Sequence, residues 1–186
     1  MQRRTALIAA VCASSGWALG APAAPSLAVQ AQRGGVLLIR HASTEPGLGD
    51  PAGFTIGQCQ TQRNLSDAGR AEARAIGDWF RRHGLQPRAV RSSQWCRCQD
   101  TARIAFGHHE DWPALNSTFA GQGQPDRQLD ELRARLGQWP AGQLEVWVTH
   151  QVIMTALTQA WPGMAEGFLV DQQGRLLARG TMAAEA

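Results

Sequence analysis

The chain has 186 residues, of which 44% are apolar and 18% charged, a composition that suits one globular domain and excludes a disordered or fibrous protein. All 18 basic residues are arginine, which excludes a P-loop lysine and a Schiff-base lysine. The net charge is +3. Without Arg3 and Arg4 the chain would have 16 basic and 15 acidic residues, a net charge of +1. The charge therefore does not indicate a nucleic-acid partner.

Residues 1–28 have the layout of a secretory signal peptide, because Arg3 and Arg4 precede an apolar run that small residues and prolines follow. We predict export to a bacterial periplasm or to the outside, with cleavage after Ala28 or earlier, near Gly20. The general secretion route is favoured and the twin-arginine route stays open. The alternative is an uncleaved anchor, although the run is shorter than the roughly 20 apolar residues that span a bilayer. The signal peptide would be the only contact with a membrane.

A linker is expected over 29–35 and a single domain over 36–186. The domain opens with Val36-Leu37-Leu38-Ile39, a continuous apolar run of the kind found in strands buried on both faces. This strand ends at Arg40 and His41. A long loop rich in glycine and proline follows it, and loops of that length are commonly functional.

Helices and short strands alternate along the middle of the chain. Ser66 or Asp67 can cap a helix that stops at Gly84. The further expected elements are a strand at 89–91, a helix from Trp95 to Gly107, an irregular segment at 108–126 and a helix at 129–136.

The C-terminal part begins with a second buried strand, Glu145-Val146-Trp147-Val148-Thr149, which ends at His150. A helix at 152–160 and a terminal hairpin of 168–170 with 176–178 complete the chain. The alternation predicts an α/β fold, a mostly parallel sheet sandwiched by helices, with the functional site at the carboxyl ends of the strands.

Four stretches in this order resemble the motifs of the histidine phosphatase superfamily, whose fold is phosphoglycerate mutase-like. Leu38-Ile39-Arg40-His41 resembles its phosphate loop. Leu65 to Ala73 resembles its Leu-Thr-x-x-Gly-x-x-Gln-Ala helix start. Ser92 to Ala102 resembles its Ser-Ser-x-Leu-x-Arg-Ala-x-Gln-Thr-Ala motif, and Val148-Thr149-His150-Gln151 its late Val-x-His-Gly.

The resemblance implies a phosphoric monoester hydrolase of the histidine acid phosphatase type. His41 would be phosphorylated while Arg40, Arg97 and His150 bind the phosphoryl oxygens, and water would then hydrolyse the phosphohistidine. A neutral imidazole is a good nucleophile toward phosphorus, and fixed positive charge stabilises the oxygens in flight. Arg63 fits equally a further phosphate ligand and a solvated arginine. Neither a cofactor nor a metal is implied.

The sequence departs from the family pattern at the proton donor, because the expected Leu-x-Glu reads Leu115-Asn116-Ser117. A leaving alkoxide needs a proton, and Glu45, Asp50 or no residue at all could supply it. Without a donor, substrates with good leaving groups are favoured.

Removal of the signal peptide would leave three cysteines, Cys59, Cys96 and Cys98. An oxidising compartment favours one disulfide, from Cys59 to either of the other two, with the third thiol buried. Zinc is the rival interpretation of the C-x-C pair, but a structural site needs four ligands.

Other functions fit less well. No cysteine has the arginine of a Cys-x₅-Arg phosphatase, and His108-His109-Glu110-Asp111 is more simply a solvated segment than a metal site. A mutase and an inactive phosphate-binding relative remain open alternatives. Gly49 to Phe54 and Trp95 to Cys98 resemble a periplasmic subgroup related to lipopolysaccharide heptose phosphatases, which makes a phosphorylated small molecule or envelope glycan the expected partner. The sequence does not indicate an oligomeric state.

Overall fold

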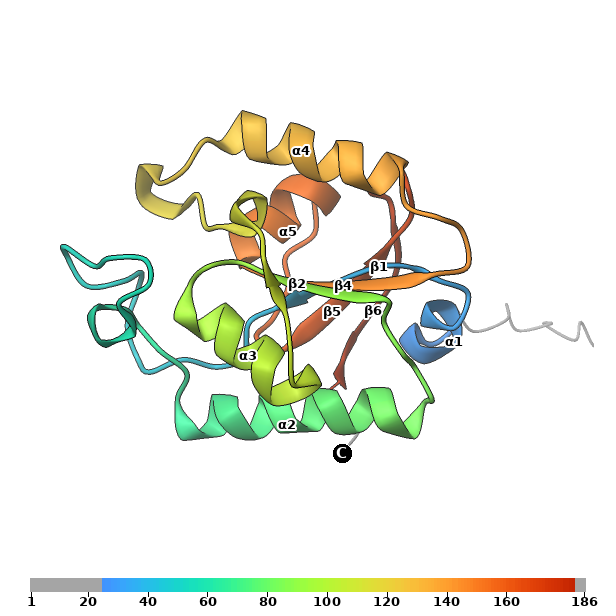
Figure 1. Ribbon diagram of the computed structural model, residues 1–186, viewed down its shortest axis with the longest axis horizontal. Coiled ribbons are helices and arrows are strands. Elements are labelled where there is room, and N and C mark those ends of the chain that lie inside the picture. The colour runs from blue at the N-terminus through green and yellow to red at the C-terminus, as the bar shows by residue number, and fades with distance from the viewer. Residues whose placement is uncertain (1–24, 183–186) are drawn as a thin grey trace, which may run out of the picture.

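A six-stranded sheet forms the centre of the protein, as a computed structural model that describes residues 25–182 shows (Figure 1). The spatial order is β3-β2-β4-β1-β5-β6. The first four of these strands are mutually parallel, β5 is antiparallel to β1, and β6 is antiparallel to β5. The strands are β1 (Gly35–Arg40), β2 (Ala89–Ser92), β3 (Glu110–Asp111), β4 (Leu144–Thr149), β5 (Glu166–Val170) and β6 (Leu176–Thr181). The expected sheet and its terminal hairpin are confirmed.

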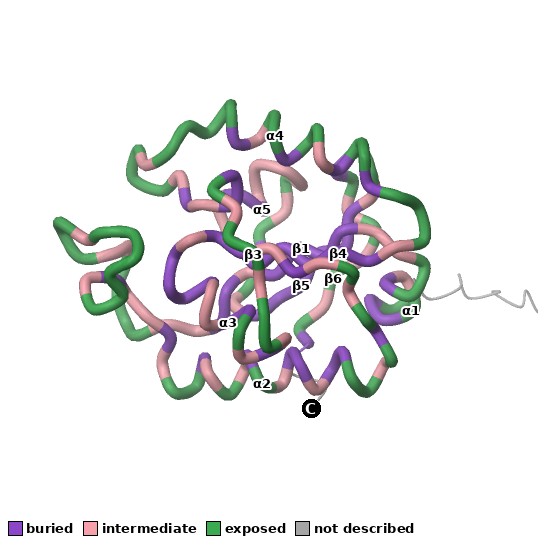
Figure 2. Tube along the Cα trace, viewed as in Figure 1, coloured by how far each residue is buried: buried purple, intermediate pink, exposed green. Residues whose placement is uncertain are grey.

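Helices cover both faces of the sheet (Figures 1 and 2). Leu37 and Ile39 of β1 belong to the apolar cluster under α1, α2 and α3, whereas Val36 and Leu38 belong to the cluster under α4 and α5. This alternation explains the unbroken apolar run in the sequence, because each face of a buried strand meets its own helical layer. The helices are α1 (Leu27–Ala31), α2 (Asp67–Arg82), α3 (Cys96–Phe106), α4 (Pro125–Gly137) and α5 (Gln151–Thr158).

Local signals set the helix ends. The Ser66 side chain accepts a hydrogen bond from the Gly69 N–H and caps α2. Gly107 ends α3 with a left-handed φ of 79°, a conformation that glycine adopts without steric cost. The predicted boundaries of these two helices are therefore close to the observed ones.

The N-terminal segment differs from the expected linker at 29–35. Residues 27–31 form α1, and Leu27, Ala28 and Ala31 are buried in the core. Cleavage after Ala28 would remove two of these core side chains, whereas cleavage near Gly20 would leave the helix whole. The rest of the predicted signal peptide lies outside the described residues. Among residues 25–182, no helix has the length and apolar character needed to cross a membrane.

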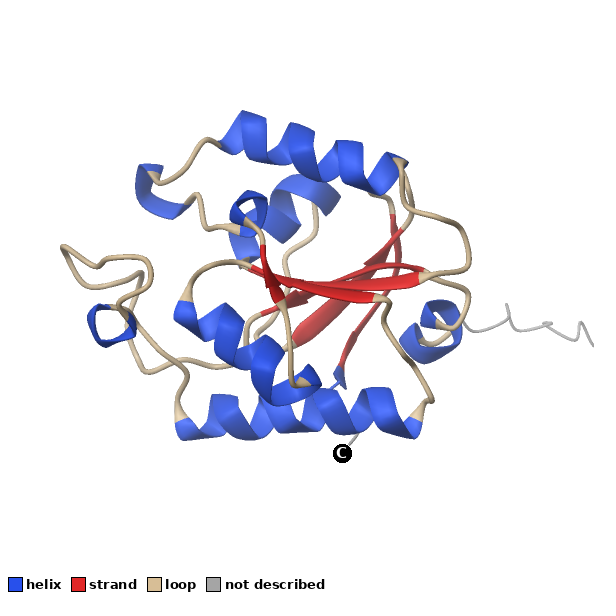
Figure 3. Cartoon of the chain, in the orientation of Figure 1, coloured by secondary structure: helices blue, strands red, loops and turns tan. Residues whose placement is uncertain are grey.

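A long loop joins β1 to α2 and extends beyond the sheet on the side where β1 ends (Figure 3). It contains only a short 3-10 turn at Cys59–Thr61. The segment 108–126 is also largely irregular, with β3 and the 3-10 turns Pro113–Leu115 and Phe119–Gly121. These two segments lie around the site described next.

Candidate active site

Two histidines meet where the central strands β1 and β4 end. The parallel register pairs Arg40 with Thr149, so the following residues, His41 and His150, emerge at one edge of the sheet. The centroids of their rings lie 5.4 Å apart. Each residue is only 3% exposed. The prediction that the two apolar strands carry two imidazoles to one edge is confirmed by this geometry.

His41 is held as a neutral imidazole with a defined tautomer. Its Nδ1 lies 2.9 Å from the Ala42 carbonyl oxygen, and because a carbonyl only accepts, Nδ1 carries the proton and Nε2 keeps its lone pair. Burial and the nearby Arg97 lower the pKa of His41 to about 3. The imidazole is therefore neutral at neutral pH, with Nε2 unprotonated, which is the state that a nucleophile at phosphorus requires.

The backbone after His41 is fixed by α2 and α3. The Ala42 N–H donates to Thr101 Oγ1 at 3.1 Å. The Ser43 N–H and hydroxyl donate to the two carboxylate oxygens of Glu72 at 2.7 and 2.8 Å. A side chain at Gly69 would place its Cβ 1.8 Å from the Ser43 carbonyl oxygen, so only glycine lets α2 approach this closely. Ala42 follows His41 at a position where the motif that the sequence resembles has glycine. Alanine is accommodated there without strain, because its φ is not positive.

His150 is anchored from the opposite side of the sheet edge. Its Nε2 lies 2.8 Å from the Ser93 hydroxyl oxygen, and the same oxygen lies 3.2 Å from Asn116 Oδ1. Burial, followed by the positive charge of Arg97, lowers the pKa of His150 well below its ordinary value. The sequence motif contains Ser93, but the contribution of Asn116 depends on the fold of segment 108–126.

Arg97 lies in the first turn of α3 and is clamped by a carboxylate from the long loop. Its Nη1 donates to Asp50 Oδ1 at 2.7 Å and its Nη2 to Asp50 Oδ2 at 3.1 Å. Asp50 also accepts from Trp95 Nε1 and from the Arg63 backbone N–H, both at 3.0 Å. Burial alone would raise the pKa of Asp50, but the hydrogen bonds from Arg97 and Arg63 hold it below its ordinary value.

Arg40 and Arg63 complete a cationic cluster with Arg97. Arg40 Nη1 donates to the Pro162 carbonyl at 2.9 Å, and Arg63 Nη1 donates to the Gly47 carbonyl. The Nε–H groups of all three arginines are buried and have no acceptor among the described residues. Burial and the other two guanidinium groups lower the pKa of Arg40. Three cations thus face the single carboxylate of Asp50.

These groups line one cavity of about 210 Å³. Its charged and titratable residues are Arg40, His41, Asp50, Arg63, Arg97 and His150. The structure therefore brings together all five residues that the sequence predicts for the site, Arg63 included. It adds Asp50, which the sequence proposes only as a proton donor.

Among the described residues, none that lines the cavity is suited to be the proton donor. Ser117, which stands at the position of the family's glutamate, lines the cavity without offering a carboxyl group. Asp50 lies in the cavity, but its lowered pKa keeps it ionised, so it has no proton to give. Glu45 lines a neighbouring depression instead. Within the described residues, no other carboxyl group lines the cavity.

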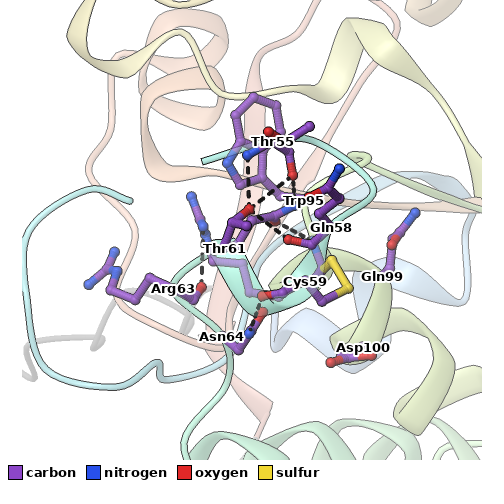
Figure 4. The surroundings of a disulfide bond; sticks show 12 residues. Thr55, Gln58, Cys59, Thr61, Arg63, Asn64, Trp95, Gln99 and Asp100 are labelled. Atoms are coloured by element: carbon purple, nitrogen blue, oxygen red, sulfur yellow. Dashed lines mark hydrogen bonds between the residues drawn. A yellow bond between two sulfur atoms is a disulfide. The ribbon is translucent and has the colours of Figure 1, made fainter. Parts of the chain in front are cut away.

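A disulfide joins the long loop to α3 beside Arg97. Cys59 and Cys96 are bonded, and Cys98 is free and buried, which confirms the expected single disulfide and resolves its pairing. Figure 4 shows the disulfide near Gln58 and Asn64. Burial raises the pKa of the Cys98 thiol to about 12, so this thiol is unreactive.

The histidine pair outside the site, His108 and His109, has few potential metal ligands beside it. His109 Nε2 lies 3.3 Å from Asp111 Oδ1, and the part of the chain that the structure describes holds no group of three or more histidine, cysteine, aspartate or glutamate side chains placed to bind a metal.

The fold and the site together define an α/β protein with a cationic, histidine-bearing pocket at the edge of its sheet. The model of the histidine phosphatase superfamily (branch 1) matches residues 36–144. This is more than half of the chain, and the chain therefore belongs to that superfamily, which includes phosphatases and mutases.

Solved structures share the fold. The protein histidine phosphatase SixA complexed with tungstate matches with a TM-score of 0.57 and 15% identity, covering 81% of this chain and 99% of that one. Phosphoglycerate mutase from Thermus thermophilus matches with a TM-score of 0.54 and 19% identity, over 77% of this chain and 96% of the other. No curated protein sequence matches the chain. At these identities the likeness extends to the fold alone.

Proposed function

We propose that the protein is a phosphatase that hydrolyses phosphomonoesters through a phosphohistidine at His41. The observation that carries the proposal is the convergence of three arginine side chains on the cavity that also contains His41, whose Nε2 keeps its lone pair. Within the described residues, Asp50 supplies the one carboxylate that lines this cavity with them. The oxygens of a phosphoryl group would supply further acceptors for the guanidinium groups and further negative charge.

The first chemical step transfers the phosphoryl group to the protein. The Nε2 lone pair of His41 forms a bond to phosphorus while the bond from phosphorus to the leaving oxygen breaks. The Nδ1–H bond to the Ala42 carbonyl stabilises the positive charge that develops on the ring. Arg40, Arg97 and His150 hold the equatorial oxygens, where the charge of the transition state is greatest.

The second step returns His41 to its starting state. Water attacks the phosphorus, the bond from nitrogen to phosphorus breaks, and inorganic phosphate leaves. Because the cavity has no protonated carboxyl group among the described residues to assist the first leaving group, substrates whose leaving group departs as a stable anion are favoured. Aryl phosphates are of this kind, and phosphohistidine also needs no proton from a carboxyl group when its imidazole departs as a neutral ring.

We further propose that the protein is exported and acts on small phosphorylated substrates of the cell envelope or its surroundings. The layout of residues 1–28 supports export, and a disulfide at Cys59–Cys96 suits an oxidising compartment. The alternative function is an inactive relative that binds phosphorylated ligands. The missing proton donor favours that alternative, whereas the nucleophile-ready tautomer of His41 argues for turnover.

Trapping of the intermediate tests the proposal. The purified protein is mixed with ³²P-labelled p-nitrophenyl phosphate and quenched in alkali, which preserves phosphohistidine. We expect label on the peptide that contains His41 and no label in His41→Ala. A protein that binds phosphate but shows neither label nor phosphate release would be the inactive relative, and label on a different residue would overturn the assignment of the nucleophile.

A further inference from the structure

Large exposed apolar side chains gather at the mouth of the cationic cavity. Leu48, Phe119 and Trp161 are 88%, 41% and 67% exposed, and all three line the cavity that contains His41. Only three other large apolar side chains of residues 25–182 are comparably exposed, and one of them, Ile56, lines an adjoining depression. Single exposed apolar residues are ordinary, but a cluster at one place marks a binding surface.

Contacts of Trp161 and Phe119 tie the apolar rim, Leu48, Phe119 and Trp161, to the rest of the site. The carbonyl of Trp161 accepts from Arg179 Nη2 at 3.1 Å, and the carbonyl of the next residue accepts from Arg40. The Phe119 ring lies 3.3 Å from the position of a Cβ on Gly49, and so packs against the loop next to Leu48. Trp161 and Phe119 are therefore held at the cavity wall, and Leu48 lies in the loop that Phe119 contacts.

The interior and the rim make opposite chemical demands on one ligand. Three arginines that line the cavity favour an anion, whereas the rim of the same cavity offers hydrocarbon and aromatic surface. A body rich in hydroxyl groups would give up hydrogen bonds to water on such a surface without replacement. Resting on the proposed phosphatase function, we propose that the substrate is a phosphoester with an apolar aryl leaving group, a hydrocarbon-rich aromatic body attached directly to the phosphate oxygen.

A series of n-alkylphosphonates from one to eight carbons tests this inference apart from catalysis. Their carbon–phosphorus bond is not hydrolysed, so calorimetric titration below the micellar concentration reports binding even if the protein does not turn over. Each methylene that the rim buries should lower Kd by up to about fourfold. Failure to trap phosphohistidine together with a rising affinity along the series would overturn the proposed catalysis and leave the apolar subsite in place.

Variants of the rim and a matched control locate the effect. Leu48→Ala and Trp161→Ala should weaken octylphosphonate more than methylphosphonate. Leu177→Ala removes another exposed leucine, 47% exposed and outside this cavity, and should leave the whole series unchanged.

Four results would overturn the inference. The first is a Kd independent of chain length. The second is tighter binding of glucose 6-phosphate than of hexylphosphonate, which would assign the rim to a sugar. The third is self-association that Trp161→Ala abolishes, combined with a flat series, which would assign the rim to a second copy of the chain. The last is no binding by any member, which would remove the phosphate site as well.

Discussion

The sheet edge and the long loop between β1 and α2 contribute to the same cavity by different physical means. At the sheet edge, backbone pairing places the chemistry, because His41 donates its backbone N–H to the Thr149 carbonyl at 3.0 Å and His150 follows directly. In the loop, side-chain contacts do the work: Asp50 holds Arg97, and the Cys59–Cys96 disulfide fastens the loop to α3.

The difference separates two tasks. A nucleophile whose position relative to phosphorus must be set to within a few tenths of an ångström is best placed by rigid strands. Residues that meet the variable leaving group can lie on a loop, where sequence changes are tolerated. The loop nevertheless contributes to catalysis through Asp50, because this carboxylate holds Arg97 in the proposed phosphate pocket. Substitutions in each region can therefore test how much that region contributes to the rate of hydrolysis.

The largest effect is expected at the sheet edge. His41→Ala should abolish turnover of p-nitrophenyl phosphate, because it removes the nucleophile. His108→Ala is the matched control, since His108 is an exposed histidine outside the cavity, and it should keep the native rate. Thermal unfolding checks that the first variant is folded. A folded His41→Ala protein with native activity would remove the mechanism.

The next largest effect is expected where the loop meets α3. Arg97→Ala should lower kcat/KM by about 10²-fold or more, the cost of losing one transition-state donor. Arg103→Ala, on the exposed side of the same helix, should change it little. Arg97→Lys keeps the charge next to Asp50 but lacks the planar fork, so it separates loss of the donor geometry from misfolding. A loss of less than threefold in both Arg97 variants would contradict the role.

The two regions also differ in how far the sequence reveals them. The apolar runs that end at Arg40 and at Thr149 predict two adjacent buried strands, and the parallel arrangement then brings His41 and His150 together without knowledge of any loop. The Ser66 cap predicts the start of α2 for a similarly local reason. These parts follow from periodicity and short motifs.

The loop contacts could not be predicted in this way. Asp50 and Arg97 are 47 residues apart, and their pairing depends on the path of an irregular segment with no periodicity to read. The same holds for Asn116, which reaches Ser93 from segment 108–126. The short helix α1 escapes prediction because residues 1–28 have the layout of a signal peptide. The Ser26 side chain caps this helix, and packing against β5 and β6 stabilises it.

A smaller effect should decide what Asp50 does. Asp50→Asn removes the charge that faces Arg97 and turns an amide N–H toward a guanidinium group, so Arg97 should be held less well and kcat/KM should fall by about tenfold. Because the lowered pKa of Asp50 keeps it ionised, it positions Arg97 rather than donating a proton. The loss should therefore be equal for p-nitrophenyl phosphate and for phenyl phosphate, whose leaving group is poorer.

Asp78→Asn is the control for this change, because Asp78 is a half-exposed carboxylate on α2 that pairs with Arg81 at the surface. It should leave both rates unaltered. A loss in Asp50→Asn that grows as the leaving group becomes poorer would instead identify Asp50 as the proton donor.

The last effect is on stability and comes from the same two histidines. In the folded protein, burial lowers the pKa of His41 to about 3 and that of His150 well below its ordinary value, whereas in the unfolded chain both take up protons near pH 6.5. Below that pH the unfolded state binds more protons, so the free energy of unfolding falls as the pH falls. The slope should reach up to about 1.4 kcal/mol per pH unit for each histidine.

The window between pH 6.5 and 5 isolates this contribution, because carboxyl groups titrate mainly at lower pH. Urea unfolding of the wild type and of His41→Gln across that window measures it, since the variant has one buried histidine fewer and should lose about half of the slope. Equal slopes in the two proteins would show that folding does not lower the pKa of His41. The ring would then be protonated at the acid end of the window, and it could act as the nucleophile only at higher pH.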